Sequence, residues 1–419
     1  MKNLLLFGAI IFSLTSEAQI SLEACIEAAE KNSSQTQLIQ LVKQAEILQI
    51  NALNKNLLPQ ASIGGQATWQ SAVTSFPLKL PNIEVPTIPK DQYKATFDFN
   101  QTIWDGGQLK GQKLLTNAST NTEIKNIESN IFQLREQISN LYFGVLLASK
   151  QYELSKISQN DIQNQLNRAK ANIQNGTVIK SSGLALEAKL IEINQLQREI
   201  RSRKLAALNG LTILTGLDIN ENSDLSQPQN LVNDNANINR PELYYFDAQE
   251  QMLNANKSIT DAKYRPKLAL FGTAGYGRPG LNFLSPDFGS YFIGGLSLKI
   301  PVSQIYTQSK GLDYQLIDIN KLKIGKQKAL FVQQVRLKLG SLNEEAAKLT
   351  DQIIEDEKLI KIRAEIKKAS ANKLENGVAT VSEFLTDSDN ESIAMENLVL
   401  HQIQLMQVQN AIKLALGNK

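Results

Sequence analysis

The sequence has very few of the side chains on which most enzymes depend. It contains one cysteine, Cys25, and one histidine, His401, and only 6% of its 419 residues are aromatic. A single cysteine excludes an intrachain disulfide, and one cysteine with one histidine leaves no Cys/His zinc site and few acid–base schemes based on histidine. His401 also falls on an apolar helical seam, where a packed side chain is favoured over a metal ligand. We therefore expect no enzymatic activity and no cofactor.

An excess of charge of one sign and long apolar runs are also missing. Lys plus Arg is 44 against Asp plus Glu at 41, a formal net charge of +3, which gives no reason to expect nucleic acid as a partner. The apolar run over residues 4–14 is too short for a membrane-spanning helix, which needs about twenty residues, and no later segment comes closer. Lys2 precedes this run, and Ser16 and Ala18 follow it at the spacing of a cleavage site, so residues 1–18 are predicted to be a secretory signal peptide.

The residues after this segment bear on whether Cys25 carries a lipid. Glu23, an acidic residue two positions before the cysteine, and the polar stretch behind the apolar run both argue against a lipid-attached cysteine. We expect Cys25 to be a small buried side chain on the first helix of the mature chain.

The sequence repeats itself at an offset of roughly 200 residues. Pro59 at the start of one strand pair recurs as Pro266, and the turn Asn175-Gly176 recurs as Asn376-Gly377. The same order of strand pair, long helix, Asn-Gly turn and returning helix occurs in both halves. The predicted organisation is therefore a first repeat over residues 19–217, a linker over 218–239 and a second repeat over 240–419.

The helical stretches carry a narrow apolar stripe. Between residues 124 and 173 apolar side chains recur at alternating spacings of three and four, which is typical of a coiled-coil seam, and a similar run begins at Val332 and breaks at Asp356. The helix predicted over about 107–175 would be roughly 100 Å long at about 1.5 Å per residue, which no compact domain accommodates. Further helices are predicted over about 21–57 and 181–214.

Four segments alternate apolar and polar residues in the manner of strands. They cover about 60–70, 95–103, 268–276 and 291–300, with Gln101 as an exception on the apolar face of the second. Runs of roughly ten residues suit transmembrane barrel strands, although a soluble sandwich remains an alternative on the strands alone. The connections over 71–91 and 277–289 would be exposed outer loops.

Closure of the sheet favours an assembly of several chains. An open four-stranded sheet in lipid would leave edge groups unpaired, so each chain must donate a sheet to a shared barrel. Two chains would give eight strands with a filled interior, whereas three would give twelve strands and room for a polar lumen. Closure of the sheet alone therefore calls for several chains and leaves both numbers open.

An ordered set of short motifs strengthens this interpretation. The motifs are Ser21-Leu22-Glu23-Ala24-Cys25-Ile26-Glu27-Ala28-Ala29, Leu57-Leu58-Pro59-Gln60, Trp104-Asp105-Gly106-Gly107, Asn175-Gly176-Thr177, Arg240-Pro241-Glu242-Leu243 and Asn376-Gly377-Val378. Together they resemble the TolC-type outer-membrane efflux proteins, also called outer membrane factors, over essentially the whole mature chain. The sequence departs from that pattern at Pro301-Val302-Ser303-Gln304, where a second Gly-Gly turn is missing.

The resemblance implies a specific architecture and set of partners. The fold would be mainly α with β, a homotrimer in the bacterial outer membrane. Its twelve-stranded transmembrane β-barrel would contact outer-membrane lipid and continue into a long periplasmic coiled-coil α-barrel. A periplasmic membrane-fusion adaptor and an inner-membrane efflux pump would dock to it. The chain would be a duct that exports small molecules passively.

The resemblance also points to candidate site residues. Glu383 matches an acidic ring position, the second expected acid falls on Thr386 beside Asp387, and an expected basic partner falls on Ala379. In a trimer, inward carboxylates would form a cation-attracting constriction, which basic residues of the neighbouring hairpin, such as Lys170 and Lys180, could hold shut. The alternative is ordinary solvated charge. The helix-tip turns proposed for adaptor docking are Asn175, Gly176, Asn376 and Gly377, and the strand-to-helix turn is Asp105, Gly106 and Gly107.

Two other functions remain open at this level. One is the outer-membrane component of a type I protein secretion system, which would differ in its partners but not in its fold. The other is a secreted coiled-coil scaffold or adhesin, in which the four strands would form a soluble sheet. The alternation of apolar residues on the strands argues against the second alternative.

Overall fold

The chain forms two compact units, which we name the helical unit and the sheet unit. In the computed structural model the described residues are 19–74, 87–175, 178–228, 237–282 and 284–418, so the predicted signal peptide lies outside them. The helical unit is drawn from Met1–Gln37, Glu128–Pro241 and Phe331–Lys419, and the sheet unit from Leu38–Ile127 and Glu242–Leu330. Each unit therefore takes residues from both predicted repeats.

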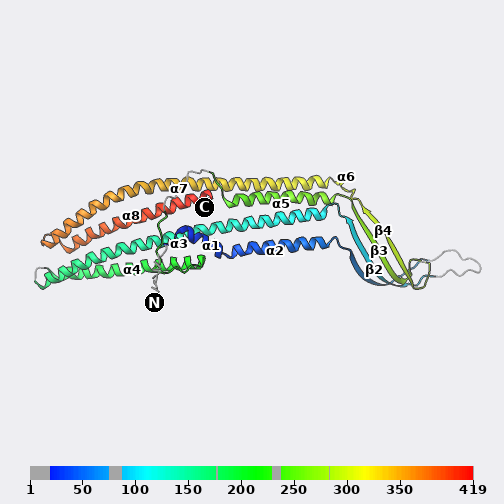
Figure 1. Cartoon of the computed structure of the whole chain (residues 1–419), viewed down its shortest axis with the longest axis horizontal. Coiled ribbons are helices and arrows are strands. Elements are labelled where there is room, and N and C mark those ends of the chain that lie inside the picture. The colour runs from blue at the N-terminus through cyan, green and yellow to red at the C-terminus, as the bar shows by residue number, and fades with distance from the viewer. Residues whose placement is uncertain (1–18, 75–86, 176–177, 229–236, 283, 419) are drawn as a thin grey trace, which may run out of the picture. The chain divides into compact units, whose positions relative to one another are not determined.

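Four long helices supply most of the helical unit. They are α3 (Gln108–Gln174) and α7 (Ser309–Glu375), with 67 residues each, and α4 (Lys180–Thr215) and α8 (Val381–Leu416), with 36 residues each. α3 and α7 begin in the sheet unit and end in the helical unit. Figure 1 shows α4 beside the end of α3, which we call the first hairpin, and α8 beside the end of α7, the second hairpin.

The first predicted helix is interrupted, and in this respect the prediction was wrong. Residues 21–57 form two helices, α1 (Leu22–Asn32) and α2 (Ser34–Lys55), separated at Ser33, whose backbone is extended. The Ser33 hydroxyl accepts a hydrogen bond from the Gln35 amide at 3.2 Å, and the Thr36 hydroxyl donates to the Glu30 carbonyl at 2.6 Å. Short polar side chains of this kind compete with helical backbone hydrogen bonds, which explains the break.

The main core of the helical unit surrounds Tyr142, which is fully buried. Its hydroxyl lies 2.8 Å from the Ile20 carbonyl and 2.6 Å from the Ser226 carbonyl, and so holds the chain before α1 against the chain after α4. Burial raises the pKa of Tyr142 to about 12. Cys25 belongs to the same core with no exposed surface, as expected for a structural thiol, and burial raises its pKa to about 11.

The sheet unit contains the four predicted strands in one antiparallel sheet. Its strands are β1 (Gln60–Trp69), β2 (Asp91–Trp104), β3 (Lys267–Arg278) and β4 (Gly289–Lys299), in the order β1-β2-β3-β4. Helices α2, α5 (Pro241–Lys263) and the first parts of α3 and α7 complete the unit. The predicted outer connections do join β1 to β2 and β3 to β4, although residues 75–86 and 283 lie outside the described part.

The missing Gly-Gly turn after β4 is replaced by different local structure. A short helix, α6 (Gln304–Thr307), stands at this point, and Gln308 takes a positive φ of 51° before α7 begins. The amides of Gly311 and Leu312 donate to the Gln308 carbonyl. A non-glycine residue therefore accepts the left-handed backbone that a glycine would adopt without strain. None of the helices in the described part of the chain has both the length and the apolar character needed to cross a membrane.

The two faces of the sheet differ in chemistry. One cross-strand row joins Ile63, Phe97, Ala274 and Phe292, and its end members are 86% and 72% exposed. The adjacent row on the opposite face places Ser62, Asp98 and Thr273 side by side, and Asp98 accepts a hydrogen bond from Thr273 at 2.7 Å. The alternation predicted from the sequence is therefore an apolar face and a polar face.

The exception on the apolar face has a local explanation. The side-chain amide of Gln101 donates to the Leu57 carbonyl at 2.6 Å, just beyond the end of α2. Gln101 thus satisfies a backbone carbonyl in the turn that follows α2. Its polar side chain has a structural role at the base of the sheet.

Removing the Tyr142 hydroxyl tests whether this contact holds the helical core. Tyr142→Phe is expected to cost about 1–2 kcal/mol, because the one hydroxyl proton shared by the Ile20 and Ser226 carbonyl oxygens is lost, and to lower the thermal midpoint by a few degrees. Circular dichroism of the purified protein measures the midpoint. Tyr306→Phe is the matched control, since Tyr306 is 78% exposed. Equal shifts for the two variants would contradict the assigned role.

Candidate functional site

The first helix-tip turn is described only at its two ends. α3 ends at Gln174, and the Asn175 amide still donates to the Ala171 carbonyl at 3.1 Å. Gly176, predicted to be the turn glycine, lies outside the described residues. α4 begins at Lys180 after Ile179, whose extended backbone supplies no side-chain cap.

The second tip is described completely. Gly377 has a positive φ of 73°, its amide donates to Leu374, and the Val378 amide donates to Lys373 at 2.9 Å. This pair of bonds is the Schellman arrangement, in which a left-handed glycine satisfies the last carbonyls of a helix. Asn376 adds a side-chain bond to the Asn372 carbonyl at 2.8 Å. The turn therefore ends α7 sharply and leaves the tip exposed.

The acidic candidates follow this turn on the first two turns of α8. The Thr380 hydroxyl accepts a hydrogen bond from the Glu383 amide at 3.2 Å, so Glu383 is the third residue of α8 and the last of a Thr-x-x-Glu capping sequence. Glu383 is exposed and Asp387 is half-buried. Within the described residues neither carboxylate forms an ion pair. A helix N-terminus favours negative charge, so Glu383 also has a structural reason to be acidic.

The strand-to-helix turn places all three predicted residues between β2 and α3. The Asp105 carboxylate accepts hydrogen bonds from the amides of Gly107 at 2.8 Å and Leu109 at 2.6 Å, which makes it the cap of α3. Gly106 and Gly107 have φ values of 72° and 89°. A Cβ atom at Gly106 would lie 3.0 Å from that of Arg265. The turn therefore requires glycine both for its backbone and for space.

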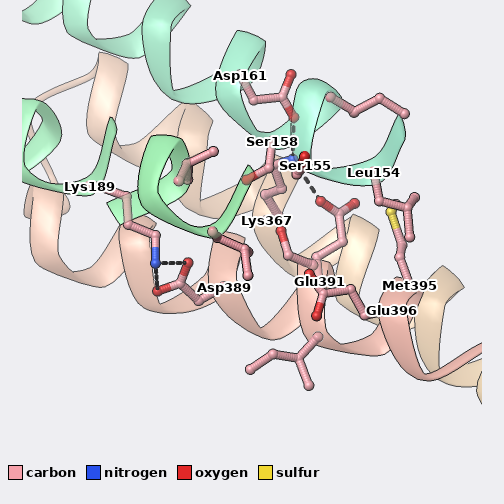
Figure 2. A pocket seen from close by; sticks show the side chains of 15 residues that line it. Leu154, Ser155, Ser158, Asp161, Lys189, Lys367, Asp389, Glu391, Met395 and Glu396 are labelled. Atoms are coloured by element: carbon pink, nitrogen blue, oxygen red, sulfur yellow. Dashed lines mark hydrogen bonds and ion pairs between the residues drawn. The ribbon is translucent and has the colours of Figure 1, made fainter. Parts of the chain in front are cut away.

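Ion pairs join the two hairpins close to these tips. The Lys367 ammonium, on α7, lies 2.6 Å from both Asp161 of α3 and Glu391 of α8, and Lys189 of α4 lies 2.8 Å from Asp389 of α8 (Figure 2). The Glu391 side chain is only 9% exposed. Lys189 and Lys367 therefore link the two hairpins within one chain.

The environment of Lys367 favours its charged form. Burial alone would lower the pKa of this amine, but the hydrogen bonds to Asp161 and Glu391 outweigh burial and raise the pKa above its ordinary value. Lys170 is engaged elsewhere, because it pairs with Glu187 at 2.9 Å within the first hairpin. Of the basic residues expected at the closed end, Lys170 is therefore neutralised within its own hairpin.

Seam positions occupied by polar residues mark these contacts. The three-and-four spacing that begins at Val332 continues through Asp356 and Lys367 to Leu374, so both polar residues stand where the pattern expects apolar ones. Asp356 is buried and lies 2.6 Å from the imidazole Nδ1 of His401 on α8. His401 is packed, as expected, but its carboxylate partner was not foreseen. The break at Asp356 was the sequence feature that could have identified it.

Comparison with known proteins supports the fold. No protein-family model and no curated protein matches the chain. Among solved structures it is similar to the outer membrane protein VceC of Vibrio cholerae, with 14% identity, 95% of this chain and 96% of that chain covered, and a TM-score of 0.67. CusC, described as forming a transmembrane channel, gives 14% identity and a TM-score of 0.71. The match covers 96% of this chain and 93% of that chain. The outer membrane channel MtrE of Neisseria gonorrhoeae in its open state gives 14% identity and a TM-score of 0.66. The match covers 95% of this chain and 89% of that chain.

These likenesses cover nearly the whole chain and show its fold. The chain has the outer-membrane-channel fold of these proteins, as the resemblance to TolC-type proteins implied. All three are described as outer-membrane or channel-forming proteins.

Replacing Glu396, which lies on α8 beside the ion pairs, tests the electrostatics of this region. Burial raises the pKa of Glu396 above its ordinary value of 4.5, against the attraction of Lys189. The folded state therefore favours the protonated carboxyl, a stabilisation that is complete below pH 4.5 and lost as the pH rises through the raised pKa. Glu396→Gln should raise the thermal midpoint by a few degrees near neutral pH, and the difference should disappear in acid. A constant difference across this pH range would contradict the assignment.

Proposed function

We propose that the chain is the outer-membrane channel of a tripartite efflux system. In this proposal residues 1–18 direct secretion, and residues 19–217 and 240–419 are tandem repeats joined by the segment 218–239. Three copies assemble into a twelve-stranded transmembrane β-barrel that continues into a periplasmic α-barrel. A periplasmic membrane-fusion adaptor and an inner-membrane efflux pump deliver small molecules, which then leave the cell passively through the trimer.

The sheet carries this proposal. Its apolar face is strongly exposed, and β1 and β4 form hydrogen-bonded ladders on one side only among the described residues. Open edges are costly in lipid because no water satisfies their amides and carbonyls. Pairing β1 of one copy with β4 of the next removes both edges, and three copies leave a lumen lined by the polar face.

The spacing of aromatic residues fits a bilayer. Tyr93 lies near the loop end of β2, where its ring and that of Tyr276 stack on Phe288, and Trp104 lies at the helix end. At about 3.3 Å per residue and a tilt of about 40°, these ends are separated by roughly 28 Å along the membrane normal. That height is close to the apolar band of about 25 Å, flanked by aromatic girdles, that barrels present to lipid.

The helix tips are proposed to form the periplasmic end of the duct. Asn175, Gly176, Asn376 and Gly377 would be presented to the adaptor, because the Schellman turn described above is exposed. In a trimer, Glu383 and Asp387 would each occur three times around the aperture. The Glu383 carboxylate is exposed and is available to face a lumen.

Adjacent residues on the two faces of β1 distinguish a lipid-exposed sheet from a soluble one. Ile63→Arg places a charge on the apolar face, which should cost about 2–4 kcal/mol in a bilayer and sharply reduce the trimer recovered from outer membranes. Ser62→Arg is the matched control, because it adds the same charge to the polar face and should assemble normally. The yield and mass of the detergent-extracted protein are the measurements.

A secreted scaffold with a soluble sheet would give a different result. Both positions are exposed in the single chain, so both arginines would then be tolerated equally. A wild-type protein that remains monomeric without detergent would also refute the proposed channel.

Removing the charge at the aperture tests the proposed role of Glu383. Glu383→Gln keeps a side chain suited to the capping position, so α8 should fold, while a trimer loses three carboxylates from its entrance. We expect weaker cation selectivity of single channels in planar bilayers. Glu344→Gln, at an exposed position of α7, is the control. Unchanged conductance and selectivity in Glu383→Gln would remove this residue from the aperture.

A further inference from the structure

A cavity of about 370 Å³ lies beside the ion pairs that link the two hairpins (Figure 2). All four long helices contribute residues to it, and all of these residues belong to the helical unit. Its volume falls in the range of sites that hold drug-sized ligands, about 300–1,000 Å³. The cavity is therefore large enough for an organic molecule.

The walls of this cavity combine apolar surface with an excess of negative charge. The apolar side chains are those of Leu154, Ile157, Ile193, Leu196, Ile393 and Met395. Four carboxylates, those of Asp161, Asp389, Glu391 and Glu396, face two ammonium groups, those of Lys189 and Lys367. The lining thus carries two more negative than positive charges.

The distribution of ion pairs isolates one carboxylate. Lys367 is engaged by Asp161 and Glu391, and Lys189 by Asp389. Among the described residues, Glu396 has neither a hydrogen bond nor a bonded ion pair, and Lys189 acts on it only electrostatically. A half-buried carboxylate without a bonded partner is costly to maintain, because it has lost part of its hydration without gaining a directly bonded countercharge. A cation in the cavity would remove that cost.

We propose that this cavity binds a hydrophobic, monovalent organic cation, with its charge next to Glu396 and its apolar groups against Leu154, Leu196 and Met395. An inorganic divalent cation fits less well. Such ions need several oxygen ligands, whereas the other three carboxylates are held by lysines and much of the wall is apolar. An anion would meet the excess negative charge. The combination of one free carboxylate and apolar walls therefore selects an amphipathic cation.

Binding here would join the two hairpins through a common ligand. The first hairpin supplies Leu154 and Leu196, and the second supplies Met395 and Glu396. A ligand that binds only the folded chain stabilises it by mass action. The site is built within one chain, so it goes beyond the proposed channel function and does not depend on transport.

Calorimetric titration of the purified full-length protein with tetraphenylphosphonium tests the proposal. A blank with detergent alone corrects for partitioning into micelles. The wild-type protein should bind about one cation per chain in a saturable manner, and Glu396→Gln should weaken binding by at least about tenfold. Glu396→Gln is expected to fold well, since it removes a partly desolvated charge, and circular dichroism verifies this. Glu365→Gln, on an exposed part of α7 outside the cavity, should bind as the wild type does.

Two further comparisons separate the charge from the apolar walls. The neutral analogue triphenylphosphine oxide should bind more weakly than the cation, and Leu196→Asn should weaken cation binding several-fold. Saturable binding that is equal in Glu396→Gln and wild type would overturn the proposal, as would no binding beyond the detergent blank. Neither result would affect the channel function, which is judged by assembly and conductance.

Discussion

The long helices depend on a contact stripe only a few side chains wide. A seam with two apolar positions per heptad buries little surface per turn, so its stability comes from length and from regular spacing. A buried charge on such a stripe is costly unless it has a partner across the stripe. Asp356 has such a partner in His401, and Lys367 in Asp161 and Glu391. The charges that link the hairpins are therefore a consequence of how narrow the seam is.

Regular patterns in the sequence predicted most of the fold. The three-and-four spacing located α3 and much of α7, and the two-residue alternation located all four strands. The exceptions arose where side chains act on the backbone locally. Ser33 divides the first helix through its own hydrogen bonds, and Gln308 adopts a positive φ shortly after the segment that lacks the Gly-Gly turn. Periodicity alone contains no information about either effect.

The candidate site was predicted less completely than the fold. The turn residues could be placed because glycine at positive φ and aspartate at a helix start have local causes, as Gly377 and Asp105 illustrate. The partners of Lys189 and Lys367 could not, because they depend on the register between helices that are far apart in the sequence. A register of that kind is set by packing and is not encoded in any single segment. Charged residues at seam positions were the available clue.

The matched lengths of the helices constrain how the chain can change. α3 and α7 have 67 residues each, and α4 and α8 have 36 each. An insertion or deletion in one helix rotates every later side chain about the helix axis unless it preserves the heptad spacing. It also displaces one member of each ion pair between the hairpins. Viable length variants of this protein would therefore gain or lose whole heptads, and would do so together in the helices that pack against one another.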